Sequence, residues 1–170
     1  LDQPVSGVLV FAKNKKAAAD LSNQISNGTM KKFYYALIYG TPIRERDTLE
    51  DYLYKDGREN LSLIVNATFP DAKKAILNYR HCSTLMVLEE GEEVSLMEIE
   101  LLTGRHHQIR AQMSNAGMPL LGDSKYGSER SKELSRDIGC KNVALCAYKL
   151  SFNHPVTHKE MFFEREPDEE

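Results

Sequence analysis

The side chains with the most chemical capability lie together in one short segment, Thr103–Arg110, which reads Thr-Gly-Arg-His-His-Gln-Ile-Arg. Arginine binds phosphates and carboxylates through a rigid fork of donors, and histidine exchanges protons near neutral pH or binds metals. The segment could therefore hold an anionic substrate, act in acid–base catalysis or bind a metal ion. The elements around it decide which of these is possible.

We predict a helix over 106–115, with Thr103 as its amino-terminal cap. His106 and Arg110 would share one face of this helix, and Arg110 would lie about 100° around the axis from Ile109. Because Ile109 belongs to the stripe that faces the core, the Arg110 guanidinium would be partly buried and would need an anionic partner. Helix geometry alone leaves open that this partner forms an ordinary structural salt bridge.

The adjacent His106 and His107 do not predict a metal site. Neighbouring residues of a helix point about 100° apart, which makes joint chelation of one ion difficult. The chain has no H-E-x-x-H spacing and no cysteine cluster to supply further ligands. Contact with RNA or a place on the helix surface is the preferred interpretation, and the free N–H groups near Thr103 could also hold a phosphate.

Two other stretches carry candidate groups. Asp2 lies in a polar loop before a predicted strand, where a lone aspartate is more often a cap or a solvated residue than a functional one. In the segment 32–36, alternation along a strand would place Phe33 and Tyr35 on one face and Tyr34 on the other. Tyr34 could stack on a base from a cleft, although packing in the core is the commoner role of such a residue.

The pattern of apolar residues predicts an α+β fold with a largely antiparallel mixed sheet and a few helices. Strands are predicted at 5–12, 33–39, 61–68, 75–79, 84–88, 94–102, 143–152 and 159–163. The polar segment 44–59 is interpreted as a loop or an edge excursion. The predicted turns lie at 69–71 and, in a hairpin, at 89–93.

Three helices are predicted, over 15–26, 106–115 and 132–137. Asn14 is the expected cap of the first helix and Gly28 its end, while Gly117 is expected to end the second in a left-handed conformation. The first helix should present one apolar face to the core. That face consists of Ala17, Ala18, Leu21 and Ile25.

Composition describes a single globular domain of 170 residues, with 41% hydrophobic and 28% charged residues. No run of apolar residues is long enough to cross a membrane. The net charge of −3 speaks against a nucleic-acid partner. However, residues 1–32 and 103–132 each carry five basic against two acidic residues, so a fold that brings them together would offer phosphates a positive face.

Several motifs occur in an order that resembles the RluA-type RNA pseudouridine synthases. Leu1-Asp2, followed by Ser6-Gly7, is similar to the end of that family's His-Arg-Leu-Asp loop. Lys32, Tyr34, Ala36, Ile38 and Gly40 match its K-x-Y-x-A-x-[VI]-x-G strand, and residues 103–110 match its T-G-R-x-H-Q-[IL]-R motif. A G-D-x-x-Y-G element follows at 122–127, and 145–155 also resembles family sequence.

The resemblance implies a catalytic site of Asp2, Tyr34 and Arg110. Asp2 would be the nucleophile, Tyr34 would stack on the target uracil, and Arg110 would pair with Asp2. The RNA-binding residues would be Lys32, Arg105, His106, His107, Gln108 and Lys125. Residues 1–170 would then form a pseudouridine synthase catalytic domain without its amino-terminal portion, because the His-Arg that precedes Leu1 in the family is not in the sequence.

The expected function is therefore isomerisation of uridine to pseudouridine in structured RNA, with ribosomal RNA preferred and transfer RNA as the alternative. No cofactor and no metal are expected, since the reaction neither oxidises nor imports a group. We further expect a cytoplasmic monomer without membrane contact. Two rival interpretations are a non-catalytic RNA-binding relative and a hydrolase that uses His106 or His107. The second lacks a paired nucleophile and base.

Overall fold

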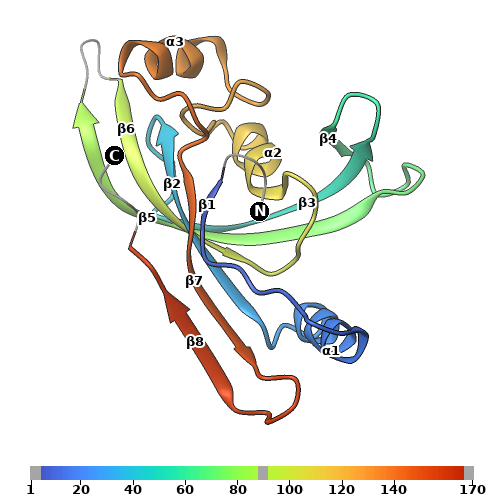
Figure 1. Cartoon of the computed structure of the whole chain (residues 1–170). Coiled ribbons are helices and arrows are strands. Elements are labelled where there is room, and N and C mark those ends of the chain that lie inside the picture. Colours follow the sequence, from blue (N-terminus) through green and yellow to red (C-terminus); the bar gives the residue numbers. More distant parts are fainter. Residues whose placement is uncertain (1–4, 88–91, 167–170) are drawn as a thin grey trace.

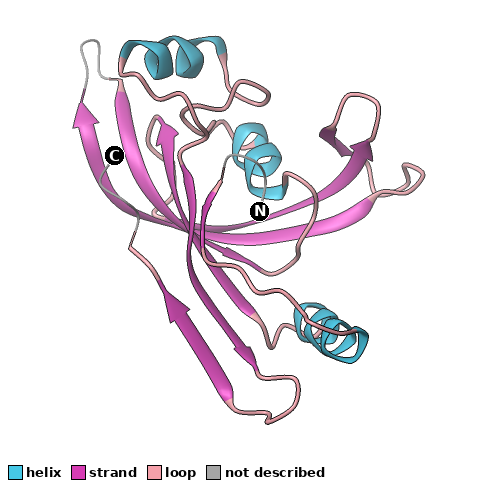
Figure 2. Cartoon of the chain, viewed as in Figure 1, coloured by secondary structure: helices cyan, strands magenta, loops and turns pink. Residues whose placement is uncertain are grey.

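The computed structural model describes residues 5–87 and 92–166, which form one eight-stranded sheet and three helices (Figures 1 and 2). The strands are β1 (Ser6–Gly7), β2 (Lys31–Tyr39), β3 (Arg46–Asp56), β4 (Leu61–Val65), β5 (Lys73–Val87), β6 (Glu93–Leu101), β7 (Leu145–Asn153) and β8 (Glu160–Glu164). The helices are α1 (Lys15–Ser26), α2 (Gln108–Asn115) and α3 (Glu129–Asp137).

The strand order is β1-β7-β2-β6-β5-β3-β4, with β8 also paired to β7. Only β1 runs parallel to its neighbour, and the other described pairs are antiparallel. The predicted α+β class with a largely antiparallel mixed sheet is therefore confirmed. Figure 1 shows α2 and α3 packed on the same side of the sheet, while α1 lies apart from them.

The main core lies between the central strands and α2. Alternate residues of β2, β5 and β6 point toward the helix, and Ile109 and Met113 of α2 meet them. Burial of these apolar side chains removes them from water and drives the association of helix and sheet. The fully buried strand residues in this layer are Ala36, Ile38, Leu77, Met97 and Ile99. We call this side of the sheet the α2 face.

Helix α1 begins and ends where the sequence predicts. The Asn14 side chain accepts a hydrogen bond from the backbone N–H of Ala17, and Gly28 follows the helix with a φ of +75°. The predicted apolar face is only partly correct, because Leu21 is buried but Ile25 is exposed. Gln24 is buried instead. Its amide forms hydrogen bonds with both backbone groups of Asn153, which ties the helix to β7.

Two strand predictions were wrong in extent. The segment 44–59 is neither a loop nor an excursion, since β3 pairs with β5 and β4 over its whole length. The sequence did not indicate this strand because many of its residues are polar. They can be polar because only part of the α2 face of β3 is covered. The predicted strands at 75–79 and 84–88 are parts of β5, which continues through polar residues with two bulges against β6.

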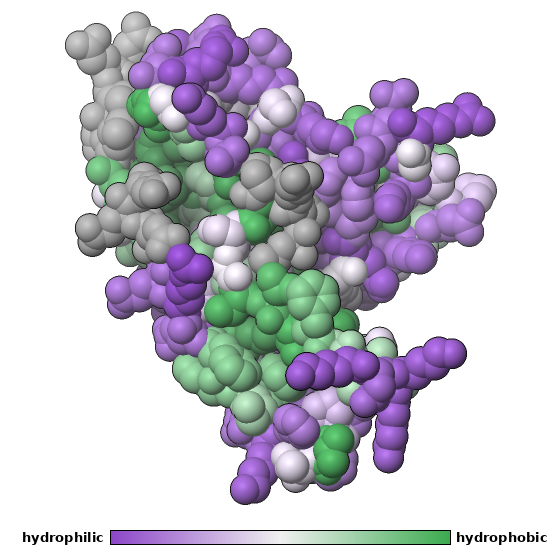
Figure 3. All heavy atoms as spheres, in the orientation of Figure 1, coloured by the Kyte–Doolittle hydropathy of each residue, from purple (hydrophilic) through white to green (hydrophobic). Residues whose placement is uncertain are grey.

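The predicted strand at 5–12 is reduced to the short β1. Gly7 has a φ of +126°, and a Cβ there would overlap the backbone of Ala147, so only glycine permits this approach to β7. Beyond β1 the chain leaves the sheet, and Leu9 and Phe11 are 48% and 84% exposed. Figure 3 shows the apolar surface to which this segment contributes.

No helix among the described residues has the length and apolar character needed to cross a membrane.

Candidate active site

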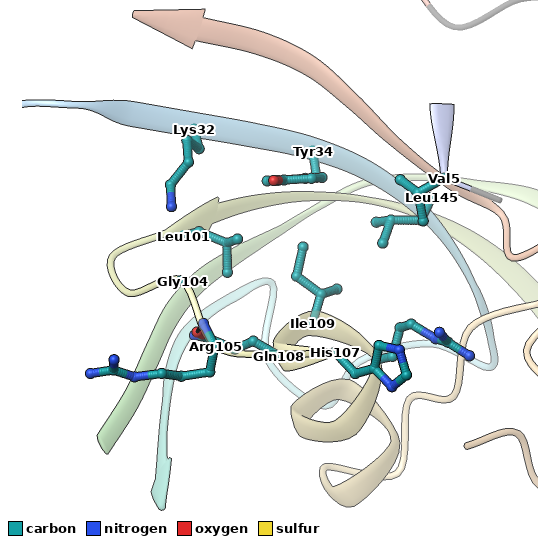
Figure 4. Close-up of a pocket in the computed structure, with 11 residues that line it drawn as sticks. Val5, Lys32, Tyr34, Leu101, Gly104, Arg105, His107, Gln108, Ile109 and Leu145 are labelled. Carbon is teal, nitrogen blue, oxygen red and sulfur yellow. Dashed lines mark hydrogen bonds between the residues drawn. The ribbon is translucent and has the colours of Figure 1, made fainter. Parts of the chain in front are cut away.

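A cavity of about 190 Å³ lies between β2, the loop after β6 and the first turn of α2 (Figure 4). Its wall is formed by residues that lie far apart in the sequence. They are Val5, Lys32, Tyr34, Leu101, Gly104, Arg105, His107, Gln108, Ile109, Arg110 and Leu145. Ligand sites for drug-sized molecules commonly measure roughly 300–1,000 Å³, so this cavity suits one small group rather than a long segment.

Lys32 and Tyr34 reach the cavity because they are two residues apart on β2. Figure 4 shows both on the same side of the strand, with the Lys32 amino group directed toward Gly104 and the Tyr34 ring above Ile109. Phe33 and Tyr35 face the other way, where the Tyr35 ring stacks on Tyr148 with centroids 3.9 Å apart. The predicted alternation is confirmed. Tyr34 also packs against the main core, so its ring has both a structural contact and a face on the cavity.

Burial lowers the pKa of the Lys32 amino group from its ordinary value. Desolvation disfavours the charged form, and a nearby anion would favour it again. A phosphate in this cavity would therefore stabilise the charged form of the Lys32 amino group and offset its desolvation.

Arg110 is buried in α2 and has an anionic partner, as the helix geometry requires. Its Nε and Nη2 donate to the two carboxylate oxygens of Asp123 at 2.8 and 2.7 Å. The side chains of the two residues are only 6% and 1% exposed. The Asp123 carboxylate also accepts hydrogen bonds from the backbone N–H groups of Lys125 and Tyr126.

Two opposing effects act on the Asp123 carboxyl. Burial alone would raise its pKa, but the hydrogen bonds from Arg110 and from the backbone of Tyr126 outweigh burial and hold the pKa below its ordinary value. Asp123 is therefore ionised at neutral pH and forms a buried ion pair with Arg110. Gly122 makes this placement possible: its φ is +69°, and a Cβ there would overlap the backbone of Asn142.

Asp2, the predicted nucleophile, lies outside the described residues. Its pairing with Arg110 therefore stays a prediction. Val5, three residues later in the chain, is described and lines the cavity together with Tyr34 and Arg110. Val5 is the first described residue, and it lines the same cavity as the other two predicted catalytic residues.

The loop before α2 differs from the prediction. The helix begins at Gln108, and its N-cap is His107, which has a left-handed backbone (φ 49°, ψ 26°). Thr103 does not cap the helix. Its hydroxyl accepts from the Ile76 N–H at 2.9 Å and bonds to the Gln108 side chain at 2.8 Å. These bonds hold the loop against β5, so residues before 108 cannot add another helical turn.

The left-handed backbone at His107 brings the two histidines together. Their rings stack with centroids 3.7 Å apart, whereas a helix would have turned them away from each other. The His106 ring lies 3.0 Å from the Ser62 hydroxyl and 3.1 Å from the Asn60 amide oxygen. Within residues 5–87 and 92–166, no group of three His, Cys, Asp or Glu side chains could hold a metal ion.

The other predicted RNA-binding residues differ in exposure. Gln108 is only 2% exposed, and its amide bonds to Ile76, Arg105 and Gln112 inside the protein. Arg105 is exposed and extends away from Tyr34 (Figure 4), with its Nε donating to the Lys74 carbonyl at 2.8 Å. Lys125 is also exposed, and its Nζ donates to the Asn60 carbonyl at 2.9 Å.

The two basic segments meet only in part. Lys32 from the first and Arg105 from the second line the same cavity, as a shared positive face requires. Asp123 neutralises Arg110, and Glu92 accepts two hydrogen bonds from Arg130. Of the basic residues in these two segments, only Lys32, Arg105 and Arg110 line this cavity.

Comparison with known proteins identifies the family of the chain. The sequence model of the RNA pseudouridylate synthase family matches residues 1–115. The chain belongs to the RNA pseudouridylate synthase family.

Relatives with curated names support the assignment. The chain is 34% identical to the "Uncharacterized RNA pseudouridine synthase YlyB" of Bacillus subtilis over 164 residues, covering 96% of this chain and 49% of the relative. It is 30% identical to the "Ribosomal large subunit pseudouridine synthase C" of Vibrio cholerae over 161 residues, with 95% and 48% covered. The chain thus spans about half the length of the curated relatives it matches.

The fold of the family is also found among solved structures. The human protein "RNA Pseudouridylate Synthase Domain Containing 1" superimposes with a TM-score of 0.78 at 25% identity, covering 98% of this chain and 66% of that one. The human "RNA Pseudouridylate Synthase Domain Containing 4" has a TM-score of 0.73 at 20% identity, covering 99% and 70%. The second likeness concerns the fold alone.

Sequence reasoning missed three residues that hold the lining of the cavity in place, Asp123, Tyr126 and Ser62. The signal for the first two is the G-D-x-x-Y-G element at 122–127, which contains both residues. The Tyr126 hydroxyl accepts from the Ser62 N–H at 2.7 Å and lies 2.8 Å from His107 Nδ1. Burial raises the pKa of Tyr126, so the hydroxyl keeps its proton at neutral pH and can donate to that nitrogen.

We expect Tyr126→Phe to lower the free energy of unfolding by about 1–3 kcal/mol, because two polar partners lose their shared hydroxyl. Urea denaturation measures the effect. Tyr52→Phe is the matched control, since the Tyr52 hydroxyl makes no hydrogen bond to a described residue. Equal stability of the two variants would show that the Tyr126 hydroxyl does not hold Ser62 and His107 in place.

Proposed function

We propose that this chain converts uridine to pseudouridine in RNA. The observation that carries the proposal is that Tyr34 of β2 and Arg110 of α2, both predicted catalytic residues, line one cavity, beside Val5 of the segment that contains Asp2. Membership of the RNA pseudouridylate synthase family supplies the reaction class. Stacking on Tyr34 and charge stabilisation by Arg110 are roles that this cavity can accommodate.

The reaction breaks the bond between uracil N1 and ribose C1′, turns the base and forms a bond from C5 to C1′. The hydrogen on C5 leaves to solvent, and N1 gains a proton. An ionised Asp2 could add to C1′, add to C6 of the base or remove a sugar proton during the sequence. Nothing is oxidised and no group is imported, so the reaction as written needs no cofactor.

The target uridine must leave its stack before it can enter a cavity of this size. Unstacking costs a few kcal/mol in a duplex and less in a loop. The Tyr34 ring would replace the lost stacking, and Lys32, Arg105 and Lys125 would bind the phosphates around the flipped nucleotide. His106, His107 and Gln108 make several contacts within the protein. We therefore propose that they hold the loop before α2 in shape in addition to contacting RNA.

Ribosomal RNA is the proposed substrate. The Vibrio cholerae relative is named as a ribosomal large subunit enzyme, and transfer RNA is the alternative. A cytoplasmic location and a monomeric state stay predictions from the sequence.

Release of tritium from RNA that carries uridine labelled at C5 tests the proposal directly. Only a reaction that replaces the C5 hydrogen sends tritium into water. Ribosomal and transfer RNA are labelled, purified and assayed separately with the same chain. We expect release from ribosomal RNA, whereas release from transfer RNA alone would favour the alternative substrate. No release from either RNA would overturn the proposed activity.

Tyr34→Ala is expected to lower kcat/KM by about 10- to 100-fold, because stacking of one base on an aromatic ring contributes about 1–3 kcal/mol. Tyr34→Phe keeps the ring and should retain most of the activity. Tritium release at several RNA concentrations compares the two variants. If Tyr34→Phe loses as much activity as Tyr34→Ala, the hydroxyl rather than the ring is the important group.

A further inference from the structure

We call the cavity lined by Tyr34 and Arg110 the uridine cavity. A second hollow, of about 360 Å³, adjoins it on the side of β3 and β4. The two share Gly104 and Arg105, so one opens toward the other around the loop before α2. We call this hollow the β3–β5 groove. Its wall is formed by Leu53, Tyr54, Lys55, Ser62, Asp71, Lys73, Gly104, Arg105 and His106.

Two lysines stand in the groove at positions where the α2 face of the sheet would otherwise be apolar. On β5, Ala75 and Leu77 point toward the helix layer and are fully buried, and Lys73 continues this row. On β3, Leu53 is buried and Lys55 is the next residue on the same face. The strands thus run past the end of α2 and place exposed cations where the helix no longer covers them.

Within the part of the chain that the structure describes, the cations of the groove lack the carboxylate partners that basic residues have on the opposite face of the sheet. On the opposite face, Lys31 pairs with Glu100, Lys74 with Glu50 and Arg80 with Glu98. Lys55, Lys73 and Arg105 form no ion pair with any described residue. Asp71 is the one carboxylate among the groove's lining residues, against three cations, so the groove carries net positive charge.

Arg105 links the two hollows. Its Nε donates to the Lys74 carbonyl, which fixes the guanidinium at the edge of β5 and points it out of the uridine cavity. A guanidinium held in this way can bind a phosphate with the donors that remain. Figure 3 shows that hydrophilic residues dominate the surface around the projecting β3–β4 hairpin, as expected for a site that binds a charged chain.

We infer that the β3–β5 groove binds the sugar–phosphate backbone of the RNA strand that carries the target uridine. This rests on the proposed function, because the strand must leave the uridine cavity on one side once its base has entered. Arg105 would hold a phosphate next to the target, and Lys73 and Lys55 would hold the following ones. Backbone contacts of this kind position an RNA without reading its sequence.

The double variant Lys55→Gln/Lys73→Gln tests the inference. The substitution keeps most of each aliphatic stem and removes two charges. We expect the dissociation constant for RNA to rise roughly fivefold or more in 150 mM salt, with a matching rise in KM. The slope of log K against log salt concentration should fall by about 1.4, at about 0.7 for each lost contact with a single strand.

Lys16→Gln/Lys159→Gln is the matched control, because it removes the same charge from exposed residues that line neither hollow. Filter binding and tritium release are measured for both double variants, with thermal melts to check folding. If both double variants bind RNA with the same affinity and salt slope, the groove does not hold RNA. If the unaltered chain binds RNA but releases no tritium, the proposed activity fails, and the salt slopes still decide whether the groove binds RNA.

Discussion

Asp123→Asn is expected to lower the free energy of unfolding by about 3–5 kcal/mol, the usual effect of removing one partner of a buried ion pair. The Arg110 and Asp123 side chains are 6% and 1% exposed, so water cannot replace the lost carboxylate. Asparagine has the same shape, but its NH2 group would face the Arg110 donors. The variant should therefore also displace the guanidinium and lower activity. Urea denaturation and tritium release measure the two effects.

The effect of Asp123→Asn should depend on pH in a defined way. The carboxyl has a folded-state pKa below its ordinary value of 3.8, so its stabilising contribution is complete above that value. As the pH falls toward the folded-state pKa, the unfolded chain takes up the proton first and the contribution is lost. The stability difference between the unaltered chain and the variant should therefore be constant above pH about 5 and shrink below pH about 4.

Glu50→Gln is the control for this prediction. It removes the ion pair between Glu50 and Lys74, whose side chains are 52% and 45% exposed. Exposed pairs contribute little to stability, because water solvates both charges well. We expect its unfolding midpoint to stay close to that of the unaltered chain. A similar midpoint for Glu50→Gln and Asp123→Asn would contradict the structural role of the buried pair.

Asp2→Asn is expected to reduce pseudouridine formation by about 10⁴-fold or more, a loss of the size seen when a catalytic nucleophile is removed. An amide cannot add to the sugar or the base as an ionised carboxylate can. RNA affinity should change by no more than a few-fold, because basic residues supply most of the binding free energy. Tritium release and filter binding separate these two effects.

Asp137→Asn makes the same chemical change at an exposed residue of α3 and should leave tritium release unchanged. A thermal melt of each variant excludes unfolding as the cause of a loss. If Asp2→Asn keeps activity within tenfold of the unaltered chain, Asp2 is not the nucleophile. The proposed chemistry would then need another group in the cavity.

The sequence determined the elements whose signals are local. Asn14 and Gly28 mark the ends of α1 because capping depends on a few neighbouring residues. Alternation along β2 predicted that Tyr34 faces away from Phe33 and Tyr35, because successive side chains of a strand point to opposite faces. The position of Arg110 beside the core stripe of α2 likewise showed that its charge needs a partner.

The tertiary structure decided which residues complete the site. Asp123 follows Arg110 by thirteen positions, and helix periodicity cannot say that the chain returns there. The left-handed backbone of His107 depends on the bonds from Thr103 and Gln108 to β5, so the stacking of the two histidines could not be read from their adjacency. A side chain's type is local, but its partner depends on where distant segments meet.

The same distinction applies to charge. The net charge of −3 gives no sign of the cationic lining of the β3–β5 groove. Lys55 and Lys73 belong to different strands, and only the pairing of β3 with β5 places them beside Arg105. The sequence by itself therefore determined the family, the fold class and the chemical groups available. The packing of strands and loops, which depends on contacts between residues far apart in the chain, decided how those groups are paired and which of them face a ligand.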